Sequence, residues 1–152
     1  MNKVYIMCGM PGAGKSTYVA NNLQDAVVIS RDIIRYKLGM TSSVDEKFVG
    51  TREQENQVTV YENELIKTAI DNNQDFVLDN MNGGPWLNKT IETIKSYNPN
   101  IKFIAINLRT PLDVCIERRK GQIDAETMVR ISTRFHYIEN RPEFSEIINI
   151  EY

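Results

Sequence analysis

Cysteine and histidine are scarce in this sequence of 152 residues, which has two cysteines and one histidine. Two cysteines are too few for a disulfide framework, and we expect Cys8 and Cys115, each in an apolar context, to be small buried thiols. His136 cannot complete a zinc site with them, because no further cysteine or histidine is available. The composition argues against both a disulfide scaffold and a metal site built on cysteine.

Long apolar stretches are also missing. No hydrophobic run approaches the roughly 20 residues of a membrane span, and the run at residues 1–8 is too short for a signal peptide. We therefore expect a cytoplasmic protein with no membrane partner. The fractions of hydrophobic (41%) and charged (25%) residues are those of a globular protein, and residues 1–152 suffice for a single domain with one core.

An excess of positive charge is the third feature that the sequence lacks. It has 18 Lys and Arg against 20 Asp and Glu, a formal net charge of −2. Proteins that follow a long nucleic acid through many phosphate contacts usually carry a basic balance, because their cations replace counterions. Any contact with nucleic acid is therefore expected to be local, at an end or over a few nucleotides beside a basic pocket.

One motif near the N-terminus stands out against these absences. A hydrophobic run at residues 3–8 leads into Gly9, and Gly9, Gly14, Lys15 and Ser16 fill every fixed place of the pattern G-x-x-x-x-G-K-[ST]. Glycines lack a Cβ, so the backbone of such a loop can turn successive N–H groups inward, and the start of the following helix favours anions. The pattern predicts a phosphate-binding loop.

This loop predicts a site for a nucleoside triphosphate, with ATP as the expected donor and Mg²⁺ as its cation. We expect Lys15 to reach the β- and γ-phosphates and the Ser16 hydroxyl to bind the Mg²⁺ that bridges them. The nucleotide-binding residues would be Gly9, Gly12, Ala13, Gly14, Lys15, Ser16 and Thr17. The alternative is a chance glycine-rich turn, which the strand and helix predicted on either side argue against.

Beyond the loop, the apolar pattern alternates between strand and helix. Strands are predicted at residues 3–8, 26–30, 75–79, 102–108 and 146–150. Helices are predicted at residues 15–23, 30–38, 52–72, 85–94, 111–119 and 125–138, and an unpatterned loop at residues 39–51. This alternation is typical of an α/β fold, with a five-stranded parallel sheet and helices on both faces.

Asp32 is the candidate general base for phosphoryl transfer to an alcohol, which needs a carboxylate near the acceptor and cations near the phosphates. It follows the second predicted strand, at the end where ligands of such sheets bind. Arg35 lies on the same helix face and would bind an acceptor phosphate, with Arg31 nearby as a second substrate-binding residue. The alternative is an aspartate that caps the helix beside solvated arginines.

Asp79 ends the third predicted strand. In nucleotide-binding sheets a carboxylate at this place holds Mg²⁺ directly or through water, so Asp79 is the second candidate metal ligand beside Ser16. Asn80 follows it and is a candidate for orienting the substrate. An Asp-Asn pair that merely forms a turn is the alternative.

Arg118, Arg119 and Lys120 form the only basic triplet of the sequence, at the end of a predicted helix. We interpret residues 118–124 as a lid, whose arginines would close over the triphosphate and stabilise the transferring charge. The alternative is that these cations merely partner the helix dipole. Trp86 shows no stacking pattern, and packing is its expected role.

With these residues in place, the chain resembles the kinase module of the bacteriophage-type 5′-polynucleotide kinases, within the P-loop kinase group. The resemblance rests on residues 9–17, on Arg31, Asp32 and Arg35, on the strand ending at Asp79, and on Arg118 and Arg119. It implies a three-layer sandwich with sheet order 2-3-1-4-5. It also implies ATP-dependent transfer of the γ-phosphoryl group to a 5′-hydroxyl end of DNA or RNA, with Asp32 as general base, Arg35 on the acceptor phosphate and a lid arginine on the donor.

Two other functions stay open. A P-loop kinase of the same fold could act on a nucleoside, a nucleotide sugar or an antibiotic, and the lack of a basic balance favours this alternative. The sequence Asn-Met-Asn at residues 80–82 also departs from the polynucleotide kinase pattern. A nucleotide-dependent switch is the third hypothesis, although no guanine-reading N-K-x-D motif is present.

Overall fold

The computed structural model describes residues 2–44, 46 and 48–152 of the chain. In chain order the elements are β1 (Lys3–Cys8), α1 (Lys15–Asn22), β2 (Val27–Ile29), α2 (Arg31–Lys37), α3 (Arg52–Asp71), β3 (Phe76–Leu78), α4 (Trp86–Tyr97), β4 (Lys102–Arg109), α5 (Leu112–Arg118), α6 (Ala125–Arg134) and β5 (Phe144–Glu151). None of the helices in the described ranges is long and apolar enough to cross a bilayer.

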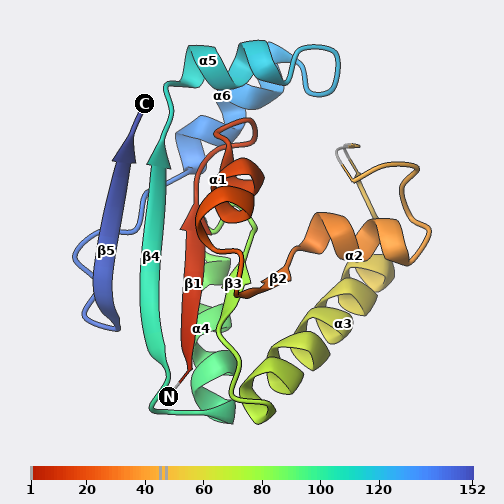
Figure 1. Ribbon diagram of the computed structural model, residues 1–152. Helices are drawn as coiled ribbons and strands as arrows, with labels where there is room; N and C mark the ends of the chain where they lie inside the picture. Colours follow the sequence, from red (N-terminus) through yellow and green to blue (C-terminus); the bar gives the residue numbers. More distant parts are fainter. Residues whose placement is uncertain (1, 45, 47) are drawn as a thin grey trace.

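The five strands form one sheet in the order β2-β3-β1-β4-β5 (Figure 1). Every neighbouring pair is parallel. The predicted fold class and sheet order are therefore confirmed. β1 lies in the middle, and four of its six residues are buried because both of its faces are covered.

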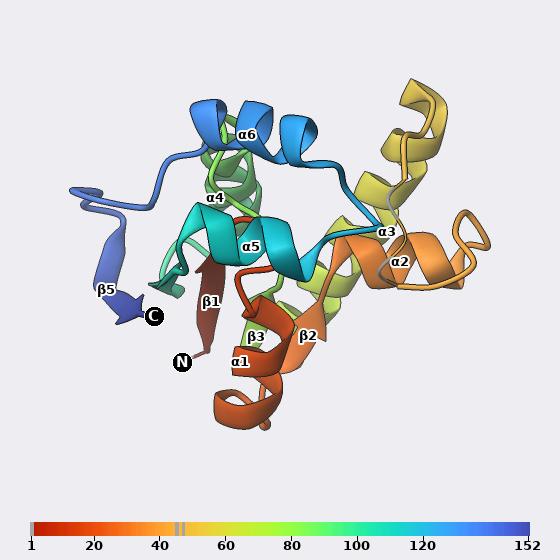
Figure 2. The ribbon, with the colours of Figure 1, turned by 90° about the horizontal axis from the view of Figure 1, so that it is seen from above.

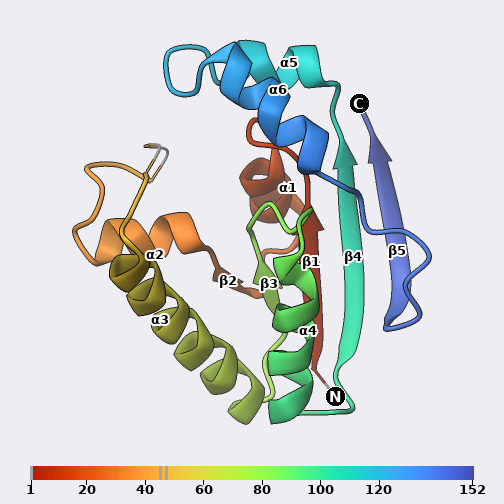
Figure 3. The same ribbon diagram turned by 180° about the vertical axis from the view of Figure 1, so that it is seen from behind.

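Successive residues of β1 point to opposite faces of the sheet, and each face has its own core. Val4 and Ile6 pack with apolar residues of α3 and α4. Met7 instead packs with Val19 of α1 and with apolar residues of α5 and α6. The two views from opposite sides agree, since α1 lies in front of the sheet in Figure 1 and α4 lies in front of it in Figure 3.

Polar residues follow the carboxyl ends of β2 and β3, namely residues 30–32 and 79–80. Seen from above, α2 and α3 lie beyond β2 on one side, whereas α5 crosses over β1 and α6 lies on the side of α4 (Figure 2). Of the predicted loop at residues 39–51, the described residues up to Gly50 form no helix or strand, and residues 45 and 47 lie outside the described ranges. Thr51 ends the loop by forming a capping box with Gln54 at the start of α3.

The last helix is shorter than predicted, because α6 ends at Arg134 instead of continuing to residue 138. Phe135 is extended, with φ −86° and ψ 135°, and its ring contacts both cores. The next backbone N–H groups are taken by partners far away in the chain: His136 N donates to Gly83 O (2.8 Å) and Ile138 N donates to Asn107 Oδ1 (3.0 Å). These tertiary bonds replace the bonds that a continued helix would make.

The last strand is longer than predicted, because β5 begins at Phe144 rather than at residue 146. Phe144 pairs with Phe103 of β4, and the two rings meet edge to face with centroids 5.9 Å apart. Such a pair adds packing energy to the strand pairing.

Candidate active site

The phosphate-binding loop has the backbone that the motif predicts. Gly12 and Gly14 adopt positive φ angles of 84° and 98°. A Cβ on Gly12 would lie 2.9 Å from the carbonyl oxygen of Cys115 in α5, so this position has no room for a side chain. Position 12 requires glycine both because its backbone is left-handed and because α5 approaches it closely.

Lys15 opens α1 and folds back over the loop. Its Nζ donates to the carbonyl oxygens of Gly9 (2.9 Å) and Met10 (3.0 Å). Burial lowers the pKa of Lys15, while the charge of Asp79 opposes this shift and the charge of Arg119 adds to it. An anion bound beside this ammonium would stabilise its charged form, which makes the loop a favourable place for phosphate.

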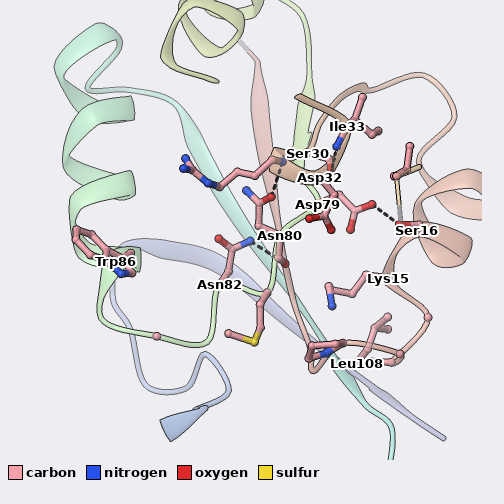
Figure 4. A pocket seen from close by; sticks show the side chains of 18 of the residues that line it. Lys15, Ser16, Ser30, Asp32, Ile33, Asp79, Asn80, Asn82, Trp86 and Leu108 are labelled. Carbon is pink, nitrogen blue, oxygen red and sulfur yellow. Dashed lines mark hydrogen bonds between the residues drawn. The ribbon is translucent and has the colours of Figure 1, made fainter. Parts of the chain in front are cut away.

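Ser16 and Asp79 are joined by a short hydrogen bond, in which the Ser16 hydroxyl donates to Asp79 Oδ2 at 2.8 Å (Figure 4). Asp79 is buried at the end of β3. Burial raises the pKa of Asp79, although the Ser16 hydrogen bond and the Lys15 charge oppose the shift. This buried carboxylate gains from a nearby cation.

A hydroxyl and a carboxylate oxygen side by side are the donors that Mg²⁺ prefers. Among the described residues no cluster of three or more His, Cys, Asp or Glu side chains could hold a metal by itself. A Mg²⁺ ion at Ser16 and Asp79 would therefore take its remaining ligands from phosphate and water, which is usual for this ion. The residues present fit Mg²⁺ bound together with a nucleotide.

Asp32 lies in the first turn of α2, and the hydroxyl of Ser30, not Asp32, caps this helix by accepting from Ile33 N. Asp32 is therefore free of the capping role that the sequence left open. Its carboxylate is 55% exposed and accepts a hydrogen bond from Arg35 Nη1 at 2.9 Å. Its charge also contributes to the pKa shifts of both Lys15 and Asp79, so the three groups lie within electrostatic reach.

Arg35 is held from two sides. Besides Asp32 it pairs with Glu55 of α3, whose two carboxylate oxygens accept from Arg35 Nε (3.3 Å) and Nη2 (2.8 Å). Burial works to lower the pKa of Arg35, but its bonds to Glu55 and Asp32 leave it raised, and the same bond lowers the pKa of Glu55. Sequence spacing does not reveal Glu55 as a partner, because it lies 20 residues from Arg35.

Arg31 and Asn80 line the pocket and hydrogen-bond to other groups of the protein. Arg31 Nη1 donates to Thr59 Oγ1 (3.1 Å) and to Glu62 Oε1 (3.3 Å). Asn80 accepts from Arg31 N (2.9 Å) and donates to Glu62 Oε2 (3.1 Å). The two residues therefore tie α2 and the end of β3 to the buried Glu62 of α3.

Arg118 and Arg119, at the end of α5, differ in their surroundings. Arg118 Nη1 donates to the carbonyl oxygen of Gly12 at 3.0 Å, and its guanidinium lies 5.6 Å from the centre of the Tyr152 ring. Arg119 Nη1 donates to Oε1 of Gln122, three residues further along the chain, and the charge of Arg119 helps to lower the pKa of Lys15. The charge of Arg119 thus acts on Lys15, whereas Arg118 bonds to the backbone of the phosphate-binding loop.

All these groups line one pocket of about 1760 Å³ at the carboxyl edge of the sheet. Typical small-ligand sites measure about 300–1,000 Å³, so this pocket has room for two ligands. Its wall also includes Trp86, the first residue of α4, which is 75% exposed (Figure 4). From the sequence, Trp86 is expected to serve in packing. Its place on the pocket wall follows only from the fold, which brings the start of α4 beside the other pocket residues.

Comparison with known proteins shows the family of this chain. A family model described as an AAA domain matches residues 4–134, and the chain belongs to this family. A comparison with curated proteins gave no match.

Three solved structures illustrate the likeness in fold. A chain of the Pnkp1/Rnl/Hen1 RNA repair complex has a TM-score of 0.71 at 17% identity, over 88% of this chain and 43% of that one. The APS kinase CysC of Mycobacterium tuberculosis, in complex with AMPPNP and APS, has a TM-score of 0.58 at 15% identity (97% and 88%). A gluconokinase from Sinorhizobium meliloti 1021 has a TM-score of 0.59 at 12% identity (98% and 82%).

These identities establish the fold alone, which is that of the P-loop kinases. The chain spans less than half the length of the Pnkp1/Rnl/Hen1 chain that it matches. The other two structures are small-molecule kinases that it matches over most of their length.

Proposed function

We propose that this chain is a single-domain, cytoplasmic, ATP-dependent kinase that transfers the γ-phosphoryl group to the 5′-hydroxyl end of a polynucleotide. The observation that carries the proposal is the meeting of three groups in one pocket: Lys15 on the loop, the Ser16–Asp79 pair, and Asp32 held by Arg35. A nucleotide-binding switch would need the first two groups but has no use for an accessible carboxylate that a hydrogen bond orients beside them.

The residues would divide the reaction as follows. The loop and Lys15 would bind the triphosphate of ATP, and Ser16 and Asp79 would hold Mg²⁺, which would supply positive charge to neutralise the phosphates. Asp32 accepts the proton of the acceptor hydroxyl while the hydroxyl oxygen bonds to the γ-phosphorus. The bond from this phosphorus to the β,γ-bridging oxygen breaks, so the products are ADP and a 5′-phosphate end.

Arg35 and the lid supply the remaining charges. The bonds of Arg35 to Asp32 and Glu55 keep the carboxylate of Asp32 in place, and the edge of its guanidinium would meet a phosphate of the acceptor strand. Arg119, which is within electrostatic reach of Lys15, would stabilise the charge of the transferring group.

The polynucleotide acceptor is supported by the resemblance at Arg31, Asp32 and Arg35, and by a pocket large enough for a strand end beside ATP. The fold shared with a chain of an RNA repair complex is compatible with it. The net charge of −2 limits the contact to a few nucleotides.

Replacing Asp32 by Asn tests the proposal. We expect Asp32→Asn to lower transfer of labelled phosphate to a 5′-hydroxyl oligonucleotide by about 10²- to 10⁴-fold, while the affinity for ADP stays near that of the wild type. Asp71→Asn, an exposed aspartate at the end of α3, is the matched control and should leave both quantities unchanged. Equal loss of transfer and of nucleotide affinity in Asp32→Asn would mean that Asp32 has a structural role.

A small-molecule acceptor is the second candidate, and one observation favours it. Arg35 is already neutralised by two carboxylates, so a phosphate would have to compete with Asp32 and Glu55 for it. The same assay, run with nucleosides and with sugars, distinguishes the candidates. Transfer to these compounds together with no transfer to the oligonucleotide would refute the polynucleotide acceptor.

A further inference from the structure

Trp86 is the only tryptophan of the chain, and 75% of its surface is exposed. Single exposed apolar residues are common on protein surfaces, but tryptophan is among the residues that are highly buried on average. This ring lines the same pocket as Asp32 and stands on the opposite wall from Lys15 (Figure 4). The residues proposed to bind ATP and Mg²⁺ and to activate the acceptor do not account for the wall that carries Trp86.

The loop that carries Trp86 is firmly held. Asn82 adopts a left-handed conformation (φ 54°), and its Nδ2 donates to the carbonyl oxygens of Met7 (2.7 Å), Leu78 (3.2 Å) and Asn80 (3.2 Å). Met81 O accepts from Gly9 N at 3.2 Å, which ties this loop to the phosphate-binding loop. The bonds of Asn82 offset its unfavourable backbone and keep the turn before α4 in one shape.

Gly83 fixes the other side of this loop. Its carbonyl oxygen accepts from His136 N at 2.8 Å, and a Cβ on Gly83 would lie 2.1 Å from the ring of Phe135. The segment after α6 therefore presses directly on the loop. Trp86 stands on a support that does not need to be ordered when a ligand binds, and such preorganisation lowers the entropic cost of binding.

Trp86 and Asp32 lie on the wall of one continuous pocket, which α3 and α4 line over several turns. The pocket residues from these two helices include Asn56, Thr59, Glu62, Asn63, Ile66, Lys89, Thr90 and Thr93. The hydroxyl, amide and ammonium groups among them suit sugar and phosphate, and the carboxylate of Glu62 is paired with Arg31. An exposed indole suits a flat ring.

We propose that Trp86 is a stacking platform for a nucleobase near the 5′ end of the acceptor strand. This inference rests on the proposed polynucleotide kinase activity and names how the strand is recognised. Single-stranded nucleic acids are commonly held by bases that stack on aromatic side chains, without regard to sequence. One platform beside the active site provides the local contact that a protein of net charge −2 can make.

The single tryptophan gives a direct test, because its fluorescence reports on Trp86 alone. We expect a 5′-hydroxyl oligonucleotide to quench this fluorescence saturably. An oligonucleotide of the same length whose first nucleotides are abasic should bind more weakly and leave the emission unchanged. ADP without acceptor should not quench it, and quenching by ADP alone would show that the ring belongs to the donor site and overturn the inference.

Kinetics supply a second readout. Trp86→Ala should raise KM for the oligonucleotide on the order of tenfold, which is the loss expected for one stacked base, and leave KM for ATP unchanged. Trp86→Phe should restore most of the loss, because a phenyl ring also stacks. Val60→Ala, at another exposed apolar residue (62%) outside this pocket, is the control and should leave both constants unchanged.

The two proposals fail in different ways. If labelled phosphate is transferred to the oligonucleotide while the emission of Trp86 and the KM of Trp86→Ala stay at their starting values, the stacking platform is refuted and the kinase proposal stands. If no oligonucleotide is phosphorylated or quenches the emission, both proposals fall.

Discussion

Replacing Gly12 by Ala should damage both the stability and the nucleotide affinity of this protein, whereas the same change at Gly39 should affect stability alone. Both glycines have positive φ angles, 84° and 74°. They differ in their surroundings, since a Cβ on Gly39 meets no atom within 4 Å but a Cβ on Gly12 comes within 2.9 Å of the Cys115 carbonyl oxygen. The pair therefore separates the backbone cost from the steric cost.

The magnitudes follow from these contacts. A left-handed backbone costs a residue with a Cβ roughly 1–2 kcal/mol, and this is the whole effect expected at Gly39. At Gly12 the clash adds about 1–3 kcal/mol, the usual cost of overpacking. It cannot be relieved by a small rotation, because the carbonyl of Cys115 also accepts the hydrogen bond from Arg119 N (3.1 Å) that ends α5. For a chain of this length the Tm should fall by about 4 °C in Gly39→Ala and by about 10 °C in Gly12→Ala.

Nucleotide binding should separate the variants further. The carbonyl oxygen of Gly12 accepts the hydrogen bond from Arg118, so displacing the loop also disturbs this bond to the end of α5. We expect the Kd for ADP to rise on the order of tenfold in Gly12→Ala, the loss of about one hydrogen bond to a charged group, and to be unchanged in Gly39→Ala. Thermal unfolding followed by circular dichroism, and calorimetric titration with ADP, measure the two effects. Equal Tm values for the variants, or unchanged ADP affinity in Gly12→Ala, would refute this account of the loop.

Three further predictions concern other charged groups. Because burial raises the pKa of Asp79, the folded wild type loses stability as pH rises through that pKa. Asp79→Asn should therefore have a higher Tm than the wild type at neutral pH, and this difference should vanish in acid. The variant should also need more Mg²⁺ for phosphoryl transfer. A lower Tm than wild type at pH 7 would contradict this. Arg119→Ala should reduce kcat by about 10²-fold or more, whereas Arg118→Ala should mainly raise KM for ATP, and the reverse pattern would exchange their roles. Glu62→Ala should lower the free energy of unfolding, measured in urea, by about 2 kcal/mol, a value between those for exposed and fully buried ion pairs. A loss under about 0.5 kcal/mol would mean that the bonds of Arg31 and Asn80 to Glu62 are dispensable for stability.

The sequence by itself determined the features that depend on neighbours along the chain. The loop at residues 9–17 is readable because its glycines, lysine and serine must stand at fixed spacing to hold phosphates. The alternation of strands and helices predicted the parallel sheet, because the apolar periods of strands and helices differ. Asp79 could be placed at the carboxyl edge because it follows a short buried strand.

Only the tertiary structure decided which distant groups meet. Arg31 bonds to Glu62, 31 residues away, and Arg35 bonds to Glu55, 20 residues away. The end of α6 at Arg134 and the support beneath Trp86 both depend on Gly83, which contacts the segment after α6. Local pattern carries no information on such pairs, because each becomes favourable only after the sheet has brought the two segments together.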